Sequence, residues 1–135
     1  MKSARFMLDT DMCCYLIRGA DAKLRAAVQR HAEGLCVSVI TVAELRFGAR
    51  KKGSPRITEA VERFLELVDI VPWTEEAADR YARLRTHLET AGQPIGNMDM
   101  LIAASALAEG CRLITHNLAH FGRVPELQVE DWVGK

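Results

Sequence analysis

Short apolar runs alternate with helical patterns along the 135-residue chain, and this alternation restricts the fold more than any other feature. Each apolar run is short enough to form one strand, and the runs lie at 5–8, 35–39, 68–73 and 111–115. Between them, apolar residues recur at helical spacing, as at Leu24, Ala27, Val28 and His31, at Ile57, Val61, Phe64, Leu65 and Val68, and at Ala77, Tyr81, Leu84 and Leu88. Strands separated by helices form a parallel sheet that is covered on both faces. The sequence therefore predicts an α/β fold with a central parallel sheet of four to five strands flanked by helices.

The length and composition are typical of one globular domain. Hydrophobic residues make up 49% of the chain, and there is no run of about 18 apolar residues that could span a membrane. The first residues do not form a basic and then apolar leader. We expect a single domain over residues 1–135, located in the cytoplasm and without a membrane segment. The four cysteines form no Cys-x-x-Cys pair and lie in apolar runs, so we expect buried thiols.

Two aspartates follow the first apolar run, at a position where parallel sheets bind ligands. Asp11 is expected to cap the helix that begins near Met12, because aspartate is a preferred capping residue. That assignment leaves Asp9 without a structural role. We therefore expect a functional role for Asp9.

Two further acids lie at the expected starts of helices. Thr41 and Glu44 have the Thr-x-x-Glu spacing of a capping box, so structural and catalytic roles of Glu44 are equally well supported. Asp99 falls in the first turn of another helix, where a negative charge gains about 0.3 to 1 kcal/mol from the helix dipole. The rest of that helix, 100–108, is apolar nearly all round and is expected to be buried. A carboxylate at the start of this buried helix is costly to remove from water, so it needs a positive partner, either an arginine or a metal ion.

These three acids are expected to meet at the carboxyl edge of the sheet. Clustered carboxylates repel one another unless a hard divalent cation neutralises them. Such a cation can polarise a phosphate and activate water for in-line displacement. The pattern formed by Asp9, Glu44 and Asp99 therefore favours phosphodiester hydrolysis.

Four stretches, taken together, point to one family: FMLDTDMCCYLIRG, VSVITVAELRFGA, GQPIGNMDMLIAASALAEG and LITHNLAHFGRVPELQVEDW. They resemble PIN-domain ribonucleases of the VapC type, the toxins of type II (VapBC) toxin-antitoxin systems. The resemblance covers essentially the whole chain and implies a three-layer PIN fold with Mg²⁺ or Mn²⁺ in an acidic cleft. It implies Asp9 and Asp99 as direct metal ligands, with Glu44 acting partly through water.

The same resemblance implies an endoribonuclease toxin that inhibits translation. Structured RNA such as transfer RNA is the implied substrate, with the anticodon loop of initiator transfer RNA as the first expectation. A VapB-type antitoxin is the implied partner, together with a homodimer and a higher assembly with the antitoxin. Helices within residues 12–33 and 54–68 offer apolar faces for these contacts.

The chain departs from the family pattern after the fourth expected strand. Many PIN domains have an aspartate where this chain has Asn117, and the VapC branch that it resembles also has asparagine there. That branch reads Thr-Asn-Asn-x-x-Glu-Phe, whereas His116 and His120 replace the first asparagine and the glutamate here. We include Asn117 among the catalytic residues, and the resemblance leaves a second metal site open.

The two histidines do not make a zinc site with Cys111. A strand over 111–115 rises by about 3.3 Å per residue, which places Cys111 roughly 16 Å from His116. The two histidines alone fall short of the four ligands of structural zinc. We expect surface roles for both, with RNA contact or proton transfer to the leaving oxygen as the functional alternative for one of them.

A basic run without acids follows Glu44, although the formal net charge of the chain is zero. The run is explained equally well as a solvated helix end and as a surface that leads an RNA backbone to the cleft. Its candidate RNA-binding residues are Arg46, Arg50, Lys51 and Lys52.

Three other functions remain open from the sequence. The Asp-x-Asp pattern at 9–11 is typical of haloacid dehalogenase-like phosphatases, but Cys13 stands where that motif has threonine or valine. His116 and His120 could support a metal-free ribonuclease by acid and base catalysis. The chain could also be a non-catalytic RNA- or protein-interaction domain whose acids only cap helices.

Overall fold

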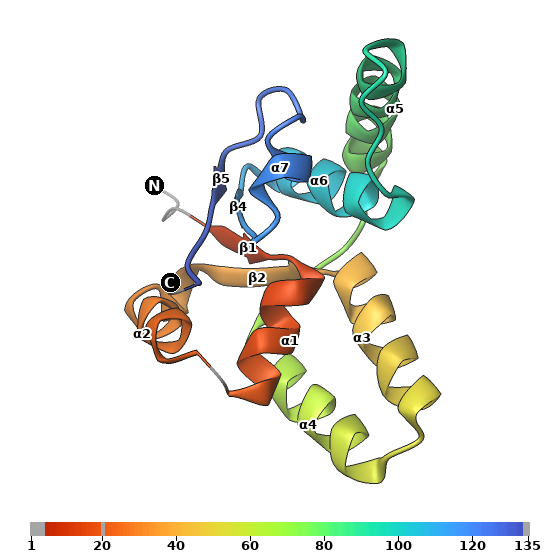
Figure 1. The fold of residues 1–135 in the computed structure, drawn as a ribbon. Coiled ribbons are helices and arrows are strands. Elements are labelled where there is room, and N and C mark those ends of the chain that lie inside the picture. The colour runs from red at the N-terminus through yellow and green to blue at the C-terminus, as the bar shows by residue number, and fades with distance from the viewer. Residues whose placement is uncertain (1–4, 20, 134–135) are drawn as a thin grey trace.

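A five-stranded parallel sheet forms the middle layer of the computed structural model, which describes residues 5–19 and 21–133 (Figure 1). The strand order is β3-β2-β1-β4-β5, with strands β1 (Phe6–Leu8), β2 (Leu35–Ser38), β3 (Asp69–Val71), β4 (Arg112–Ile114) and β5 (Val129–Glu130). The four strands expected from the apolar runs are confirmed to within two residues at each end. The short β5, which pairs with Leu113 and Ile114, was not identified from the sequence.

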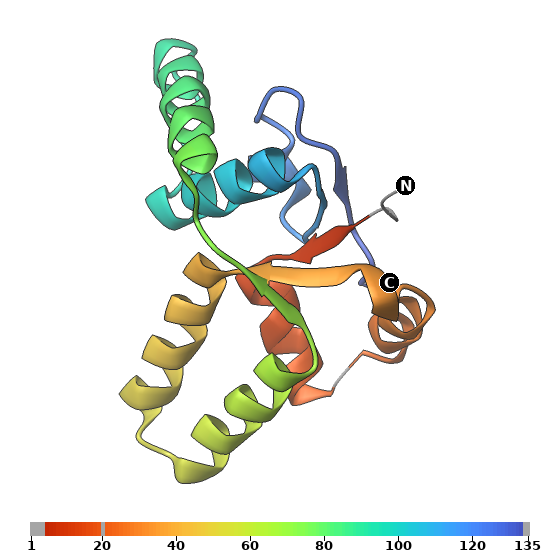
Figure 2. The ribbon, with the colours of Figure 1, turned by 180° about the vertical axis from the view of Figure 1, so that it is seen from behind.

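Helices cover both faces of this sheet (Figures 1 and 2). One face carries α1 (Thr10–Arg18), α2 (Ala22–Arg30), α3 (Val39–Lys52) and α4 (Pro55–Glu66). The other carries α5 (Glu75–Thr90), α6 (Asn97–Glu109) and the short α7 (Leu118–Phe121). A single 3₁₀ turn, η1 (Ala32–Gly34), precedes β2. The expected three-layer α/β architecture is confirmed.

Side chains along the strands alternate between two separate cores. Met7, Cys36 and Leu113 pack with α5 and α6. The next residue of each strand, respectively Leu8, Val37 and Ile114, packs with α1 to α4. This alternation follows from the two-residue repeat of a β-strand. Both faces of the sheet are therefore buried.

The apolar helix α6 is the central helix of its layer, as the sequence predicts. Six residues of α6 are buried, namely Met100, Ile102, Ala103, Ala104, Ser105 and Ala106. The Trp73 indole donates a 2.9 Å hydrogen bond to the carbonyl oxygen of Leu101. This bond fixes the segment that precedes α5 against α6. This packing holds the first turn of α6 in a fixed place at the carboxyl edge of the sheet.

All four cysteines are free thiols, which confirms the prediction for their oxidation state. Cys14 is only half-buried, whereas Cys13, Cys36 and Cys111 are buried. The sulfur atoms of Cys36 and Cys111 lie 3.6 Å apart. In the described part of the chain, no helix is both long enough and apolar enough to cross a membrane.

Candidate active site

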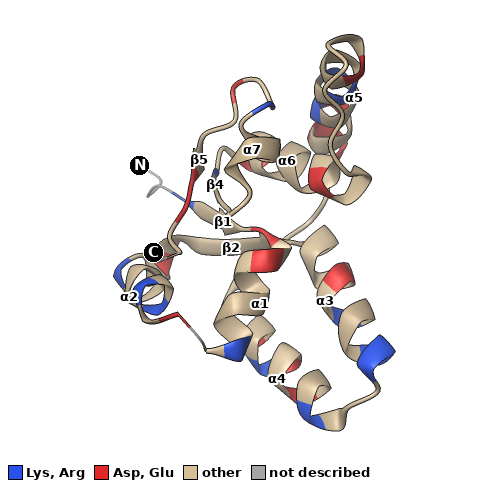
Figure 3. Cartoon of the chain, in the orientation of Figure 1, with Lys and Arg blue, Asp and Glu red and all other residues tan. Residues whose placement is uncertain are grey.

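A small polar cleft opens at the carboxyl edge of the sheet. It has a volume of about 90 Å³, which is enough for an ion with a few waters. The starts of α1 and α6, the second turn of α3 and the segment after β4 contribute its walls. Acidic residues of all three helices line it, and Figure 3 marks their positions on α1, α3 and α6 in red. The lining residues are Asp9, Thr10, Asp11, Glu44, Asp99, Asn117 and Phe121.

Asp9 is buried at the end of β1, with 4% of its surface exposed. Its carboxylate accepts a 2.9 Å hydrogen bond from the Met12 amide and so caps α1. The expectation that Asp11 provides this cap is wrong, because the helix begins at Thr10 and places Asp11 in the exposed first turn. Asp9 therefore has both a structural and a candidate functional role. Asp11 is an additional acid of the cleft that sequence reasoning assigned to capping alone.

The environment of Asp9 disfavours its negative charge. Burial raises the pKa of this carboxyl to about 6, although hydrogen bonds from Thr115 and Met12 act in the opposite direction. The neighbouring charges of Asp11 and Asp99 raise the pKa further. A cation in the cleft would relieve both the repulsion and the cost of desolvation.

Asp99 lies half-buried in the first turn of α6, as predicted. Burial raises its pKa, the charge of Glu44 raises it further, and His120 lowers it. The helix begins after Gly96 without a side-chain hydrogen bond to its first amides. The negative charge of Asp99 therefore lies beside the positive end of the helix dipole.

Glu44 does not belong to a capping box, so the structural explanation offered by its spacing is wrong. The helix α3 begins at Val39, and the hydroxyl of Ser38 caps it by accepting from the Ile40 amide at 3.1 Å. Glu44 consequently lies in the second turn, where its carboxylate accepts a 2.5 Å hydrogen bond from the Thr10 hydroxyl. Sequence reasoning missed Thr10, whose only sequence signal is its place between two cleft acids.

Asn117 lines the cleft and forms a connected pair with His120, which is not itself a lining residue. The Asn117 side-chain oxygen accepts from the backbone amide of His120 at 3.4 Å, which caps α7. The amide nitrogen of Asn117 consequently points at Nδ1 of His120, 3.0 Å away. Because that nitrogen donates, Nδ1 is the acceptor, and the neutral ring carries its proton on Nε2.

His116 has a different partner and does not line the cleft. Its Nδ1 lies 2.9 Å from the Asp131 carboxylate, and its ring meets Tyr15 edge-on. Within residues 5–19 and 21–133, no group of three His, Cys, Asp or Glu side chains converges on one ion position. This holds for the acids of the cleft as well, where Glu44 is bonded to Thr10.

The basic run extends along α3 away from the cleft, and none of its four described candidates lines it. Arg46 instead forms two 3.0 Å hydrogen bonds with the carboxylate of Glu62 on α4. Arg50, Lys51 and Lys52 lie in the last turn. Lys52 lies eight positions after Glu44, or about 12 Å along the helix. RNA contact by this run stays a prediction.

A family model described as the PIN domain matches residues 6–127. The tRNA(fMet)-specific endonuclease VapC of Salmonella typhimurium is 33% identical over 129 residues, covering 95% of this chain and 98% of that protein. Ribonuclease VapC2 of Haemophilus influenzae is 36% identical over 130 residues, covering 96% of this chain and 98% of that protein.

Solved structures give the same result. The DNA-bound VapBC complex of Salmonella typhimurium contains a chain with a TM-score of 0.92 and 33% identity, covering 96% of this chain and 99% of that chain. VapBC2 of Rickettsia felis, bound to a promoter DNA fragment, contains a chain with a TM-score of 0.89 and 34% identity, covering 94% of this chain and 98% of that chain. The fold expected from the resemblance is thereby confirmed, whereas the extent of the domain over residues 1–135 stays a prediction.

Proposed function

Because the chain belongs to the PIN-domain family and to its VapC ribonucleases, we propose that it is a metal-dependent endoribonuclease toxin. The observation that carries this proposal is the convergence of Asp9, Glu44, Asp99 and Asn117 on one cleft. These residues come from four separate segments, and Glu44 and Asp99 cap no helix, so capping alone does not account for the acids of the cleft. The proposed reaction is hydrolysis of an RNA phosphodiester bond, which stops translation.

The chemistry of the cleft donors suits magnesium or manganese, because magnesium is usually held by one or two carboxylates and keeps several waters. Carboxylate oxygens are the ligands that hard divalent cations prefer, and burial together with the charges of Asp11 and Asp99 raises the pKa of Asp9, so a cation would stabilise its ionised form. Asp9 and Asp99 would hold the ion, and Glu44 would complete the site partly through water. When bound, the ion supplies a Lewis acid for the scissile phosphate and for the attacking water.

The side chains have distinct roles in this proposal. Asp9 is held still by the Met12 amide, so its position does not depend on substrate. Glu44 accepts the proton of the attacking water, while the Thr10 hydroxyl fixes its orientation. Asn117 orients His120 through the 3.0 Å contact, which leaves the Nε2 proton available to an oxygen of the phosphate or to the leaving group.

Transfer RNA is the proposed substrate, with the initiator transfer RNA first, because the Salmonella relative is named for tRNA(fMet). The cleft is too small for a base pair, so a looped segment that exposes a single phosphate suits it. This substrate places the activity in the cytoplasm.

A VapB-type antitoxin is the proposed partner, since the similar solved structures are VapBC complexes. The chain offers an apolar groove between α1, α2 and α4, and the side chain of Leu67 at its rim is 82% exposed. A homodimer could use the exposed side of α3, where Val39 and Phe47 lie two turns apart. The higher assembly expected with the antitoxin combines these two surfaces.

Membership of the PIN family argues against the haloacid dehalogenase-like phosphatase. One experiment distinguishes the proposed function from the other two alternatives, the metal-free ribonuclease and the non-catalytic domain. The RNA ends that the purified chain produces with magnesium are sequenced beside those of the Asp99→Ala variant. We expect 5′-phosphate ends from the parent and none from the variant. Full activity in the presence of a chelator, with cyclic 2′,3′-phosphate ends, would support the metal-free histidine mechanism. Equal signals from the parent and Asp99→Ala would support a non-catalytic domain.

A further inference from the structure

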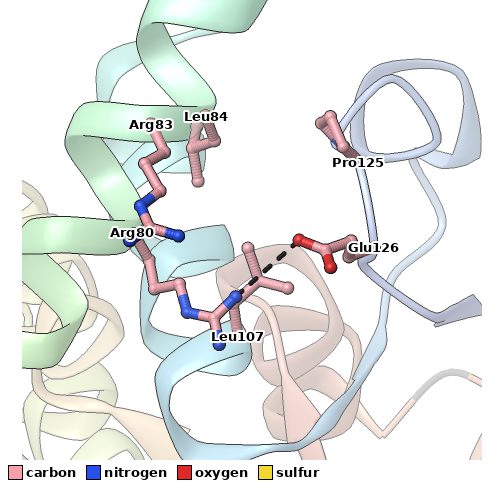
Figure 4. A pocket seen from close by; sticks show the side chains of 6 residues that line it. All are labelled: Arg80, Arg83, Leu84, Leu107, Pro125 and Glu126. Atoms are coloured by element: carbon pink, nitrogen blue, oxygen red, sulfur yellow. Dashed lines mark ion pairs between the residues drawn. The ribbon is translucent and has the colours of Figure 1, made fainter.

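A second, smaller hollow lies between α5, α6 and the segment that leads from α7 to β5 (Figure 4). Its volume is about 70 Å³, far below the roughly 300 to 1,000 Å³ of a typical small-molecule site. A ligand can therefore insert only a small group. The lining residues are Arg80, Arg83, Leu84, Leu107, Pro125 and Glu126.

Two guanidinium groups of α5, from residues about one helical turn apart, face this hollow. Only 33% of the Arg80 side chain is exposed, and in the described part of the chain its acidic partner is Glu126, at 3.8 Å. That carboxylate is itself 80% exposed and lies beyond hydrogen-bonding distance. Arg83 pairs at 3.2 Å with Asp79 of its own helix, in an exposed position where such pairs contribute little. Most of the donor capacity of both groups is therefore available to a ligand.

The backbone at Glu126 indicates that its acidic side chain is held near the hollow at a cost. Its φ angle is 68°, in the left-handed region that favours glycine. Leu84, Leu107 and Pro125 form apolar walls beside the arginines, and such walls strengthen the electrostatic attraction of Arg80, the more shielded of the two, by excluding water from it. The site therefore combines one partly desolvated cation, Arg80, with an exposed cation, Arg83, and a weakly bound internal anion.

We propose that Arg80 and Arg83 form a phosphate-binding site for the RNA backbone outside the acidic cleft, and that Glu126 competes for it. A phosphodiester offers two oxygens that can reach both guanidinium groups at once, whereas the carboxylate of Glu126 reaches only Arg80. Leu107 lies eight residues after Asp99 on α6, or about 12 Å along the helix. A short segment of RNA can span that distance, so one molecule can occupy both places. This inference rests on the proposed function, because RNA is the polyanion that the cleft is proposed to bind.

The test uses single-turnover cleavage of an initiator transfer RNA transcript by the full chain with magnesium, over a series of potassium chloride concentrations. Arg80→Gln with Arg83→Gln should raise the protein concentration for half-maximal rate by about tenfold and reduce the salt slope by about one to two. Glu126→Gln, which removes the charge of an exposed side chain, should lower that concentration by about threefold. The control is Arg85→Gln on the same helix, whose guanidinium pairs with Glu89 and Tyr81 and does not line the hollow. It should change neither quantity.

The outcomes separate the two proposals. A parent chain that does not cleave the RNA overturns the proposed function, and this inference with it. A parent that cleaves, beside a folded double variant whose half-maximal concentration and salt slope equal those of Arg85→Gln, overturns this inference alone. A Glu126→Gln variant that binds RNA no more tightly than the parent excludes the competing role of Glu126. Thermal unfolding of each variant establishes that it is folded.

Discussion

The Thr10 hydroxyl donates a 2.5 Å hydrogen bond to the carboxylate of Glu44 and thereby joins the start of α1 to the second turn of α3. Replacing the hydroxyl in Thr10→Val should destabilise the fold by about 1 kcal/mol, the usual contribution of one such bond. It should also lower the cleavage rate by roughly tenfold, or about 1.4 kcal/mol, because Glu44 loses its fixed orientation. Thr10→Ser is the matched control and should restore the rate. Equal rates for Thr10→Val and the parent would show that Glu44 needs no orientation.

Glu44→Gln separates the charge of this side chain from its hydrogen bond. The amide oxygen of glutamine can still accept from Thr10, so we expect unfolding free energies within about 0.5 kcal/mol of the parent. Loss of the proton acceptor should reduce cleavage by about 10² to 10⁴-fold. Rates are measured with saturating magnesium to separate the chemical step from metal binding. A variant that cleaves as fast as the parent would refute a catalytic role of Glu44.

The pKa of Asp9 predicts how stability depends on pH. Because this pKa rises from 3.8 in the unfolded chain to about 6 in the fold, the folded protein holds the proton more tightly. The stabilisation is complete below pH 3.8 and is lost as the pH rises to about 6, by about 3 kcal/mol in total. Asp9→Asn keeps a good capping residue and removes the titration.

This prediction is checked by measuring unfolding free energies of the parent and Asp9→Asn between pH 4 and 7. The variant should gain stability relative to the parent across the interval from about 4 to 6, while losing cleavage activity. Magnesium should stabilise the parent at pH 7 and have little effect on Asp9→Asn. A constant difference between the two chains at all pH values would contradict the raised pKa.

The pair formed by Arg46 and Glu62 tests whether the basic run contacts RNA. Both side chains are about half exposed, at 53% and 44%, so breaking the pair should change the stability of the fold little. Glu62→Gln releases the guanidinium and, if Arg46 binds phosphate, should tighten RNA binding. Arg46→Gln should weaken binding and lower the salt slope by about one. If both variants bind RNA as the parent does, Arg46 serves only to join α3 to α4.

The sequence predicted the layers well because they depend on local periodicity. Runs such as 35–39 have the length and apolar content of buried strands, and 100–108 is apolar on every side. The strand β5 has only two residues, and nothing in Val129 or Glu130 distinguishes a strand from a loop until they pair with β4. Short edge strands thus depend on tertiary pairing that a single sequence does not display.

The sequence predicted that Asp9, Glu44 and Asp99 lie together, and they do line one cleft, whereas their local contacts and the lining residues Thr10 and Phe121 were not predicted. The sequence placed the start of α1 near Met12 and so assigned the cap to Asp11, whereas the helix begins two residues earlier, at Thr10, and Asp9 caps it. A capping rule cannot choose between two aspartates that lie this close together. Similarly, Thr41 has capping-box spacing but is buried inside α3. The contact between Thr10 and Glu44 joins residues 34 positions apart, so only the fold reveals it.

Asp9 both caps α1 and belongs to the proposed active site, and this combination has a genetic consequence. If expression of the chain arrests growth, cells that survive it carry mutations that silence the chain, and at most positions silencing means misfolding and degradation. At position 9, asparagine should silence the chain and leave it abundant, whereas alanine, which cannot cap α1, should silence it and also lower its level. A selection for survivors, scored for the amount of full-length protein, would therefore separate the chemistry of this one carboxylate from its contribution to folding.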